Sequence, residues 1–195
     1  MVNMLNQVKR NSFVALLVAL LILVGGSLGA TPVLPTPGAS MFRQDFDKTG
    51  IMKISFPAML NYAYQDELRL ADLLPWFFAD FQGSLITFSD LSVMVTKQEE
   101  NTRHLVKLFP LYNTVIPEKI PSLESFPPTF PEALKFLAQT LDESAFMYAA
   151  ILKHPLMGRI EHSHLRNTCA DLRDTRGLWA SQLRALLPPL STLEE

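Results

Sequence analysis

The sequence predicts an all-α protein, a four-helix bundle with a long crossover between the second and third helices. Apolar residues recur at helical spacing in four separate segments, and no segment alternates with a period of two over a useful length. A proline-rich stretch without periodicity separates the second segment from the third, so the helices are expected as two antiparallel hairpins joined by a crossover. With 195 residues, 48% of them hydrophobic, the chain has enough apolar material for one buried core.

The first two helices are predicted from apolar stripes and from the residues at their ends. The first stripe runs from Leu60 to Phe81, and Gln82-Gly83 ends that segment. The second helix is expected to begin near Ser89, a suitable N-cap, and to end at Pro110. Its predicted inward face carries Leu91, Val95, Gln98, Glu99, Thr102, Leu105, Val106 and Phe109.

The third and fourth helices follow a connection with five prolines at residues 113–131. The third helix is expected to start around Pro131, because proline is favourable at the first helical position. It should stop near His154-Pro155, because proline disfavours helix in the residue before it. The fourth helix is expected from about Ile160 to Leu187, and Pro188-Pro189 ends it.

The first 30 residues have the features of a signal peptide. Lys9 and Arg10 precede an apolar run at residues 13–24, and small residues up to Ala30 follow. This run is shorter than the roughly 20 residues of a membrane span, so cleavage and secretion are expected over a signal anchor. Sequencing the mature N-terminus distinguishes the two. The expected regions are a signal peptide or anchor at 1–30, a proline-rich linker at 31–50 and the helical bundle at 51–190.

The charge pattern and the cysteine content exclude several classes of protein. The chain has 17 basic and 19 acidic residues, and no basic cluster lies outside the leader. Nucleic acid is therefore not an expected partner, and a membrane is expected only if the N-terminal segment stays uncleaved. A protein partner remains open. Cys169 is the only cysteine, which excludes an intrachain disulfide and a zinc finger.

Charged residues interrupt the predicted apolar stripes at similar depth. Glu67 lies at the centre of the first stripe, Glu99 within the second and Glu143 at the edge of the third. Arg173 and Arg176 lie on the fourth. With a rise of 1.5 Å per residue, Glu67 and Glu99 both fall about 20 Å from the same end of the bundle. Because an unpaired buried ion costs several kcal/mol, these groups must be paired, bound to metal, protonated or exposed.

Two further pairs of residues have the spacing of metal ligands. Glu100 and His104 are four residues apart, and Glu161 and His164 are three apart. Both pairs are expected on the solvated surface, since Glu100 falls on a polar helix face and Glu161 lies near a turn. The sequence contains no nucleophile elbow, glycine-rich phosphate loop or dinucleotide fingerprint, which disfavours hydrolases and nucleotide enzymes.

At these residues the chain resembles the ferritin-like superfamily, and especially exported ferritin-like proteins described as fungal stress-response and plant desiccation-related proteins. Residues 60–71 (LNYAYQDELRLA) are similar to that family's pattern L-x-Y-A-x-x-x-E-x-x-x-A. Residues 136–143 (FLAQTLDE) are similar to its segment F-L-A-x-A-Q-x-L-E, with the acidic position shared between Asp142 and Glu143. The resemblance covers roughly residues 56–186.

In that superfamily, a working site takes one Glu from each of two helices and Glu-x-x-His from the other two, and it holds two metal ions. The resemblance places Glu67 and Glu143 at the single acids, Glu99-x-x-Thr102 at one pair and Arg173-x-x-Arg176 at the other. Thr therefore stands where the family has His, and two cations stand where it has Glu and His. Two cations are incompatible with a metal dication a few ångströms away.

We therefore expect an exported protein with a degenerate, metal-free site, no cofactor, and a non-catalytic role in stress or interaction. Arg176, together with Arg173, is expected to neutralise Glu67, Glu99 and Glu143 through charge-assisted hydrogen bonds. The alternative is a carboxylate-bridged metal-binding protein or oxidase with two iron or manganese ions. Its ligands would come from Glu67, Glu99, Glu100, His104 and Glu143.

Overall fold

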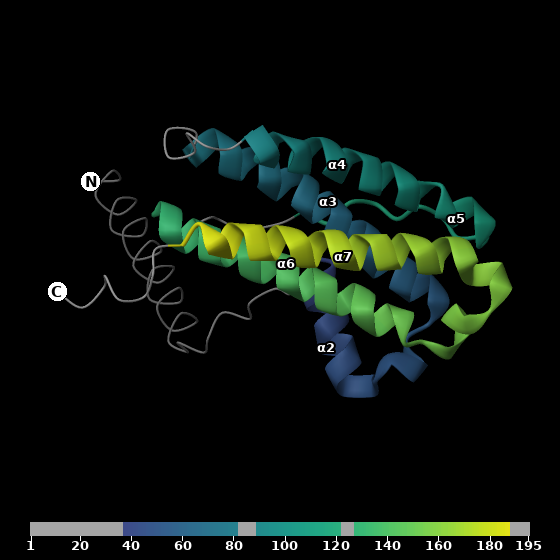
Figure 1. Cartoon of the computed structure of the whole chain (residues 1–195). Coiled ribbons are helices and arrows are strands. Elements are labelled where there is room, and N and C mark those ends of the chain that lie inside the picture. Colours follow the sequence, from purple (N-terminus) through teal and green to yellow (C-terminus); the bar gives the residue numbers. More distant parts are fainter. Residues whose placement is uncertain (1–36, 82–88, 122–126, 188–195) are drawn as a thin grey trace, which may run out of the picture. The chain divides into compact units, whose positions relative to one another are not determined.

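The computed structural model of the chain describes residues 37–81, 89–121 and 127–187, which contain helices and irregular segments but no strand (Figure 1). The predicted all-α class is therefore confirmed for these residues. In chain order the elements are α2 (Ala39–Thr49), η1 (Ile51–Lys53), α3 (Phe56–Phe81), α4 (Ser89–Val106), α5 (Leu108–Leu111), α6 (Phe130–Leu152), η3 (Pro155–Gly158), η4 (Ile160–His162) and α7 (Ser163–Ala185).

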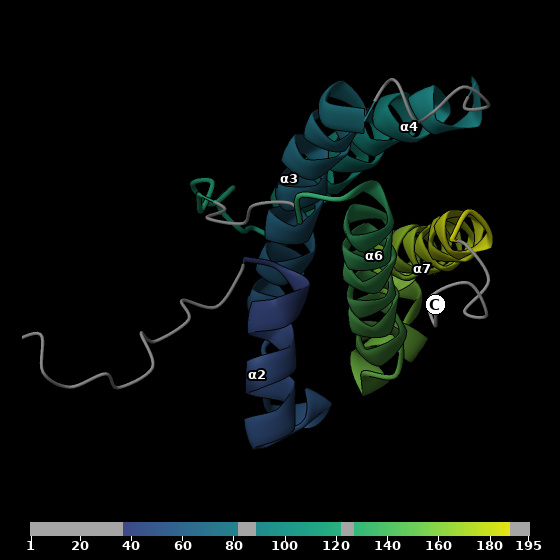
Figure 2. The same ribbon diagram turned by 90° about the vertical axis from the view of Figure 1, so that its left-hand side faces the viewer.

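Among the described helices, the four long ones pack as two antiparallel pairs. α3 lies beside α4, and α6 lies beside α7 (Figure 1). α6 also packs against α3, and α7 packs against α4, so all four helices share one interior. Figure 2 shows α6 between α3 and α7, with α2 against the lower part of α3.

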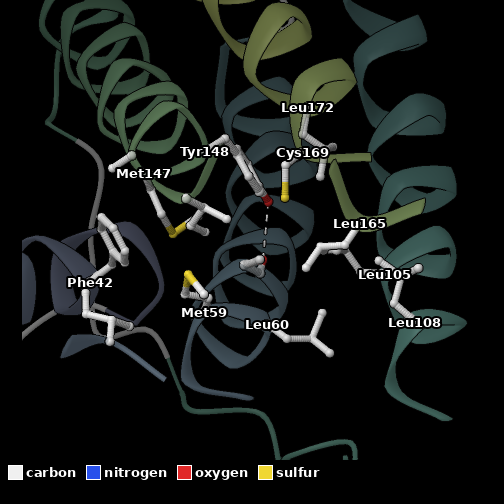
Figure 3. Packing of buried hydrophobic residues seen from close by; sticks show 14 of the residues in the cluster. Phe42, Met59, Leu60, Leu105, Leu108, Met147, Tyr148, Leu165, Cys169 and Leu172 are labelled. Atoms are coloured by element: carbon white, nitrogen blue, oxygen red, sulfur yellow. Dashed lines mark hydrogen bonds between the residues drawn. The ribbon is translucent and has the colours of Figure 1, made fainter. Parts of the chain in front are cut away.

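The apolar interior of these helices forms two clusters. The first cluster lies between α2, α3, the end of α4, α6 and the first half of α7. It includes Phe42, Met59, Leu60, Ala63, Leu105, Met147, Tyr148, Leu165, Cys169 and Leu172 (Figure 3). The second cluster is built from the opposite half of the long helices, and includes Leu70, Leu74, Phe77, Met94, Leu134, Leu137, Leu141, Trp179 and Leu183. Every long helix contributes to both clusters.

Helix α2 lies where a linker was expected at residues 31–50, so that expectation is wrong for residues 39–49. Ala39, Phe42 and Phe46 follow one another at helical spacing, and the first two are buried in the first cluster. Proline and small residues before them suggested a linker by composition. The short apolar stripe forms a helix because it packs against α3 and α6. This tertiary packing cannot be inferred from the local sequence.

Two other predicted boundaries are shifted. α4 begins at Ser89, as predicted, but ends at Val106, and Pro110 lies in the short helix α5. Pro110 has no N–H to donate to the Val106 carbonyl and its ring clashes with that group, so α4 cannot continue through it. α7 begins at Ser163, whereas the predicted start, Ile160, begins η4. The predicted start of α6 is correct to within one residue.

Residues 118–120, in the connection between α5 and α6, lie beside α3. Gln65 of α3 binds their main chain twice: the side-chain amide donates to the Glu118 carbonyl at 2.7 Å, and the Ile120 N–H donates to Gln65 Oε1 at 2.9 Å. An ion pair of 2.5 Å between Lys119 and Asp72 adds a third link. The two hydrogen bonds give partners to the Glu118 carbonyl and the Ile120 N–H, which have no helix or strand to satisfy them.

Several predictions fall outside the described residues. They concern the signal peptide, the helix end at Gln82-Gly83 and the prolines at 188–189. Within the part of the chain that the structure describes, no helix has both the length and the apolar character needed to cross a membrane.

Gly38 brings α2 against α3, and Gly38→Ala tests this docking. Its φ is +81°, and a Cβ there would lie 2.4 Å from the Asp66 Cα. We expect Gly38→Ala to lower the unfolding free energy by at least about 1–3 kcal/mol, the usual cost of such a backbone conformation for alanine. Gly177→Ala in α7 is the matched control, because nothing lies within 4 Å of its Cβ position. It should stabilise the protein by up to about 1 kcal/mol. Equal unfolding free energies for Gly38→Ala and wild type in urea titrations would contradict the docking of α2.

Candidate functional site

A layer of buried polar side chains separates the two apolar clusters. On α3 it lies between Ala63 of the first cluster and Leu70 of the second, and on α7 it lies between Leu172 and Trp179. We call this set the polar layer. It consists of Asp66, Glu67 and Arg69 of α3, Gln98 and Asn101 of α4, Thr140, Ser144 and Tyr148 of α6, and Arg176 of α7.

An ion pair between Glu67 and Arg176 forms the centre of the polar layer. Both residues are 0% exposed, and Arg176 Nη2 donates to Glu67 Oε2 at 2.5 Å. The same nitrogen donates to Gln98 Oε1 at 2.6 Å. The guanidinium also lies over the Trp179 ring, 4.8 Å from its centroid. A buried charge of either sign would be strongly unfavourable alone, so each residue requires the other.

Both oxygens of the Glu67 carboxylate accept hydrogen bonds from other helices. The Tyr148 hydroxyl donates to Oε1 at 2.7 Å, and Gln98 Nε2 donates to Oε2 at 2.6 Å. Gln98 Nε2 also lies 2.8 Å from the Glu67 main-chain carbonyl. Figure 3 shows Tyr148 extending from α6 toward α3, with Cys169 of α7 beside it. One carboxylate of α3 thus binds α4, α6 and α7.

The guanidinium of Arg176 is only partly satisfied by protein acceptors. Its Nε and Nη1 have no hydrogen-bond partner among the described residues, and neither has Asn101 Nδ2. A buried donor without an acceptor costs about 1–3 kcal/mol.

Asp66 makes a second set of contacts within the polar layer. It accepts the N–H of Ala39 at 3.1 Å and the hydroxyl of Ser144 at 2.5 Å, so it joins α2 and α6 to α3. Arg69 Nη1 lies 3.8 Å from its carboxylate. Burial raises the pKa of Asp66 from 3.8 to about 6, although Arg69 and the two hydrogen bonds oppose this rise.

Two other acidic side chains near Glu67 are held in their protonated forms. Burial, reinforced by the negative charge of Glu67, raises the pKa of the Tyr148 phenol well above its ordinary value. The same two causes raise the pKa of the Cys169 thiol to about 12. Tyr148 is therefore a hydrogen-bond donor at neutral pH, and Cys169 does not supply a thiolate nucleophile.

Only Glu67 and Arg176, of the residues predicted to form the site, lie in the polar layer. Glu99 is exposed on α4, which corrects the expectation that it shares the interior with Glu67. Arg173 is half-buried and donates to the neighbouring Asp174 at 2.8 Å, so it does not join Arg176 in neutralising the acids. The prediction that three carboxylates converge in the interior is therefore wrong. Of the three, only the Glu67 carboxylate is paired with a guanidinium there, that of Arg176.

The remaining predicted residues are also separate from the pair. Thr102 is half-buried and donates to the Gln98 carbonyl of its own helix at 3.1 Å. Glu143 is half-buried on the side of α6 that faces α2. Glu100 pairs with Lys97 at 2.8 Å on the surface, and His104 is exposed, as the polar-face expectation had it.

The sequence analysis missed Gln98 as a site residue because the predicted stripe of α4 was too wide. It included both Gln98 and Glu99, but adjacent residues point about 100° apart, so only one can face the core. The buried residues are Met94, Gln98, Asn101 and Leu105, a run with intervals of four and three. That run, with two amides in it, is the signal that would have located the inward face. Asp66, Ser144 and Tyr148 were not predicted as site residues either. Ser144 and Tyr148 are uncharged, and Asp66 is adjacent to Glu67, which was assigned to the inward face.

The polar layer does not fit the two metal ions that the ferritin-like resemblance implies. Both oxygens of Glu67 already accept from protein donors, and a dication bound there would be repelled by the Arg176 guanidinium. Within residues 37–81, 89–121 and 127–187, no three His, Cys, Asp or Glu side chains are grouped so that they could hold a metal ion. The alternative ligand set is not assembled either, since Glu99 and His104 are exposed.

Comparison with known proteins adds no relative. No protein-family model matches the chain, and no match was found among curated proteins or solved structures.

Arg176→Met tests the buried ion pair. The substitution leaves Glu67 buried without a counter-charge, so we expect the unfolding free energy to fall by about 3–5 kcal/mol. Adding Glu67→Gln removes the stranded charge, and the double variant should be more stable than Arg176→Met alone. Arg173→Met, one turn away and partly solvated, should change stability by no more than about 0.5 kcal/mol. Urea titrations that give Arg176→Met the stability of wild type, or that give no recovery in the double variant, would contradict this pairing.

Asp66→Asn tests the raised pKa of Asp66. Because the pKa is about 6 in the folded chain and 3.8 ordinarily, the folded state binds the proton more tightly than the unfolded state. The unfolding free energy of wild type should therefore fall, relative to that of Asp66→Asn, as pH rises from 3.8 through 6. Asparagine keeps an acceptor for Ala39 and offers a donor to Ser144. Unfolding free energies measured across this range with the opposite slope would show that the site favours the anion.

Proposed function

We propose that this chain is an exported, ferritin-like four-helix-bundle protein in which a buried ion pair takes the place of metal ions, and that its role is non-catalytic. The observation that carries the proposal is the contact of 2.5 Å between Glu67 and Arg176, both fully buried. In the ferritin-like pattern, the position of Glu67 supplies a metal-ligating acid and that of Arg176 a metal-ligating histidine. A guanidinium in the second position neutralises the acid that would otherwise require a metal.

The arrangement of the long helices supports the bundle topology in this proposal. α3 packs with α4 and α6 with α7, and residues 118–120 of the connection between α5 and α6 lie beside α3. The polar layer crosses all four long helices at one level, midway between two apolar clusters. Di-metal carboxylate proteins of the bundle type build their sites at such a level, from side chains on facing helices.

The chemistry of the polar layer supports a non-catalytic role. Glu67 and Arg176 neutralise each other away from solvent, and Tyr148 and Cys169 stay protonated at neutral pH. A catalytic site needs a group with access to substrate and a pKa near the working pH. The stress-linked or interaction role comes from the resemblance of residues 60–71 and 136–143, and export comes from the apolar run at residues 13–24.

Metal analysis tests the proposal directly. The full chain is produced without a histidine tag in medium supplied with iron, manganese and zinc, and its metal content is measured by mass spectrometry. We expect all three metals well below one ion per chain, because Arg176 repels a dication from the Glu67 carboxylate. The thermal midpoint should be the same with and without EDTA. Two ions per chain, or a midpoint lowered by EDTA, would favour the di-iron or di-manganese alternative.

The double variant Glu100→Gln/His104→Ala is the matched control for adventitious surface binding. It removes the exposed acid–histidine pair of α4 and leaves the polar layer intact. An ion that disappears in this variant and is retained in Glu67→Gln was bound at the surface, and the proposal stands. An ion that persists in it, and is lost in Glu67→Gln, lies at the buried carboxylate and rules out a metal-free interior.

A further inference from the structure

A half-open cavity of about 380 Å³ lies between α2 and α6, and no role has been assigned to it so far. Its walls carry opposite charges, from Arg43 on α2 and Glu143 on α6. The lining residues are Ala39, Ser40, Arg43, Gln44, Glu143 and Phe146. The volume is at the lower end of the range of about 300–1,000 Å³ for small-molecule sites, so a ligand here is small.

Glu143 is a half-buried carboxylate that the fold leaves unpaired. It makes no hydrogen bond or ion pair with any residue that the structure describes. A hydrogen-bonded cation stabilises a carboxylate that is partly withdrawn from water. Such charge-assisted hydrogen bonds are about twice as strong as neutral ones. The α6 wall of the cavity therefore favours an ammonium or similar group.

Arg43 lies on the α2 wall with its side chain 54% exposed, and it does not pair with Glu143. Its guanidinium lies over the Phe146 ring, 4.1 Å from the centroid, and its Nε donates to Asp47 at 3.2 Å. Its two Nη groups donate to no described residue. The α2 wall therefore offers a positioned cation with free donors, which suits a carboxylate.

We propose that this cavity binds a small zwitterion of the free α-amino acid type, with its ammonium group at Glu143 and its carboxylate at Arg43. A simple cation would be repelled by Arg43, and a simple anion would be repelled by Glu143. A zwitterion matches both walls and leaves the net charge of the cavity unchanged. Ala39 and Phe146 offer apolar contact to a side chain, and Ser40 and Gln44 offer hydrogen-bonding groups.

Three probes of similar shape test the charge requirement on the full chain: L-leucine, isopentylamine, which lacks the carboxylate, and 4-methylpentanoate, which lacks the amine. Binding is measured by calorimetry and by ligand-observed NMR. We expect L-leucine to bind. The affinity of each singly charged probe should be lower by at least about tenfold, because each lacks one charge-assisted hydrogen bond. The proposal is overturned if L-leucine does not bind, or if isopentylamine binds as tightly.

Two substitutions that keep a side chain of similar size test whether the ligand binds in the cavity. Glu143→Gln and Arg43→Gln each remove one charge, and each should weaken L-leucine binding about tenfold. Both variants should fold, because Glu143 has no partner to lose and the Arg43–Asp47 pair is exposed. Lys97→Gln and Glu100→Gln on α4 are matched controls that remove a surface pair of similar exposure, and should leave binding unchanged. Unchanged binding in Glu143→Gln would overturn the proposal. None of these outcomes depends on the metal content of the polar layer.

Discussion

The fold depends on the burial of one charge, the carboxylate of Glu67, at the centre of helix α3. A carboxylate that is 0% exposed must be neutralised and hydrogen-bonded, and here the partners come from three other helices. Arg176 supplies the opposite charge, Gln98 contacts both ions, and Tyr148 donates to the remaining oxygen. A shift of any long helix by one turn would remove a partner from this carboxylate. The ion pair therefore fixes the register of the helices more strictly than apolar packing alone would.

The polar layer also explains why the interior is divided and how α2 is held. Apolar side chains on either side of the layer can be replaced by others of similar volume at modest cost. A polar group inside the layer cannot lose its hydrogen-bond partner without a larger cost. Asp66, next to Glu67, extends the layer to the start of α2, where Gly38 packs directly on the Asp66 backbone. Burying two ions costs their desolvation, and the partners that this burial requires favour one arrangement of the described helices.

The sequence located the ion pair but not its surroundings. Glu67 and Arg176 could be predicted because each is a charge in the middle of an apolar stripe, where a buried ion must be paired. Glu99 could not be separated from Gln98, because both belong to a stripe drawn too broadly and a helix turns by about 100° per residue. Glu143 and Ser144 present the same ambiguity on α6, and there too the uncharged residue faces the layer while the acid faces α2.

The sequence by itself determined the helical class, the approximate bounds of the long helices and the presence of a buried charge on α3 and α7. These follow from local rules: the period of apolar residues, proline at helix ends and the cost of an ion in an apolar stripe. Only the tertiary structure decided that residues 39–49 form a helix, that one carboxylate and not three is neutralised in the interior, and that Gln98 links the two ions. Those outcomes depend on the angle at which each helix meets its neighbours, and burial is set by the neighbours that cover a side chain and not by the residues beside it in the sequence.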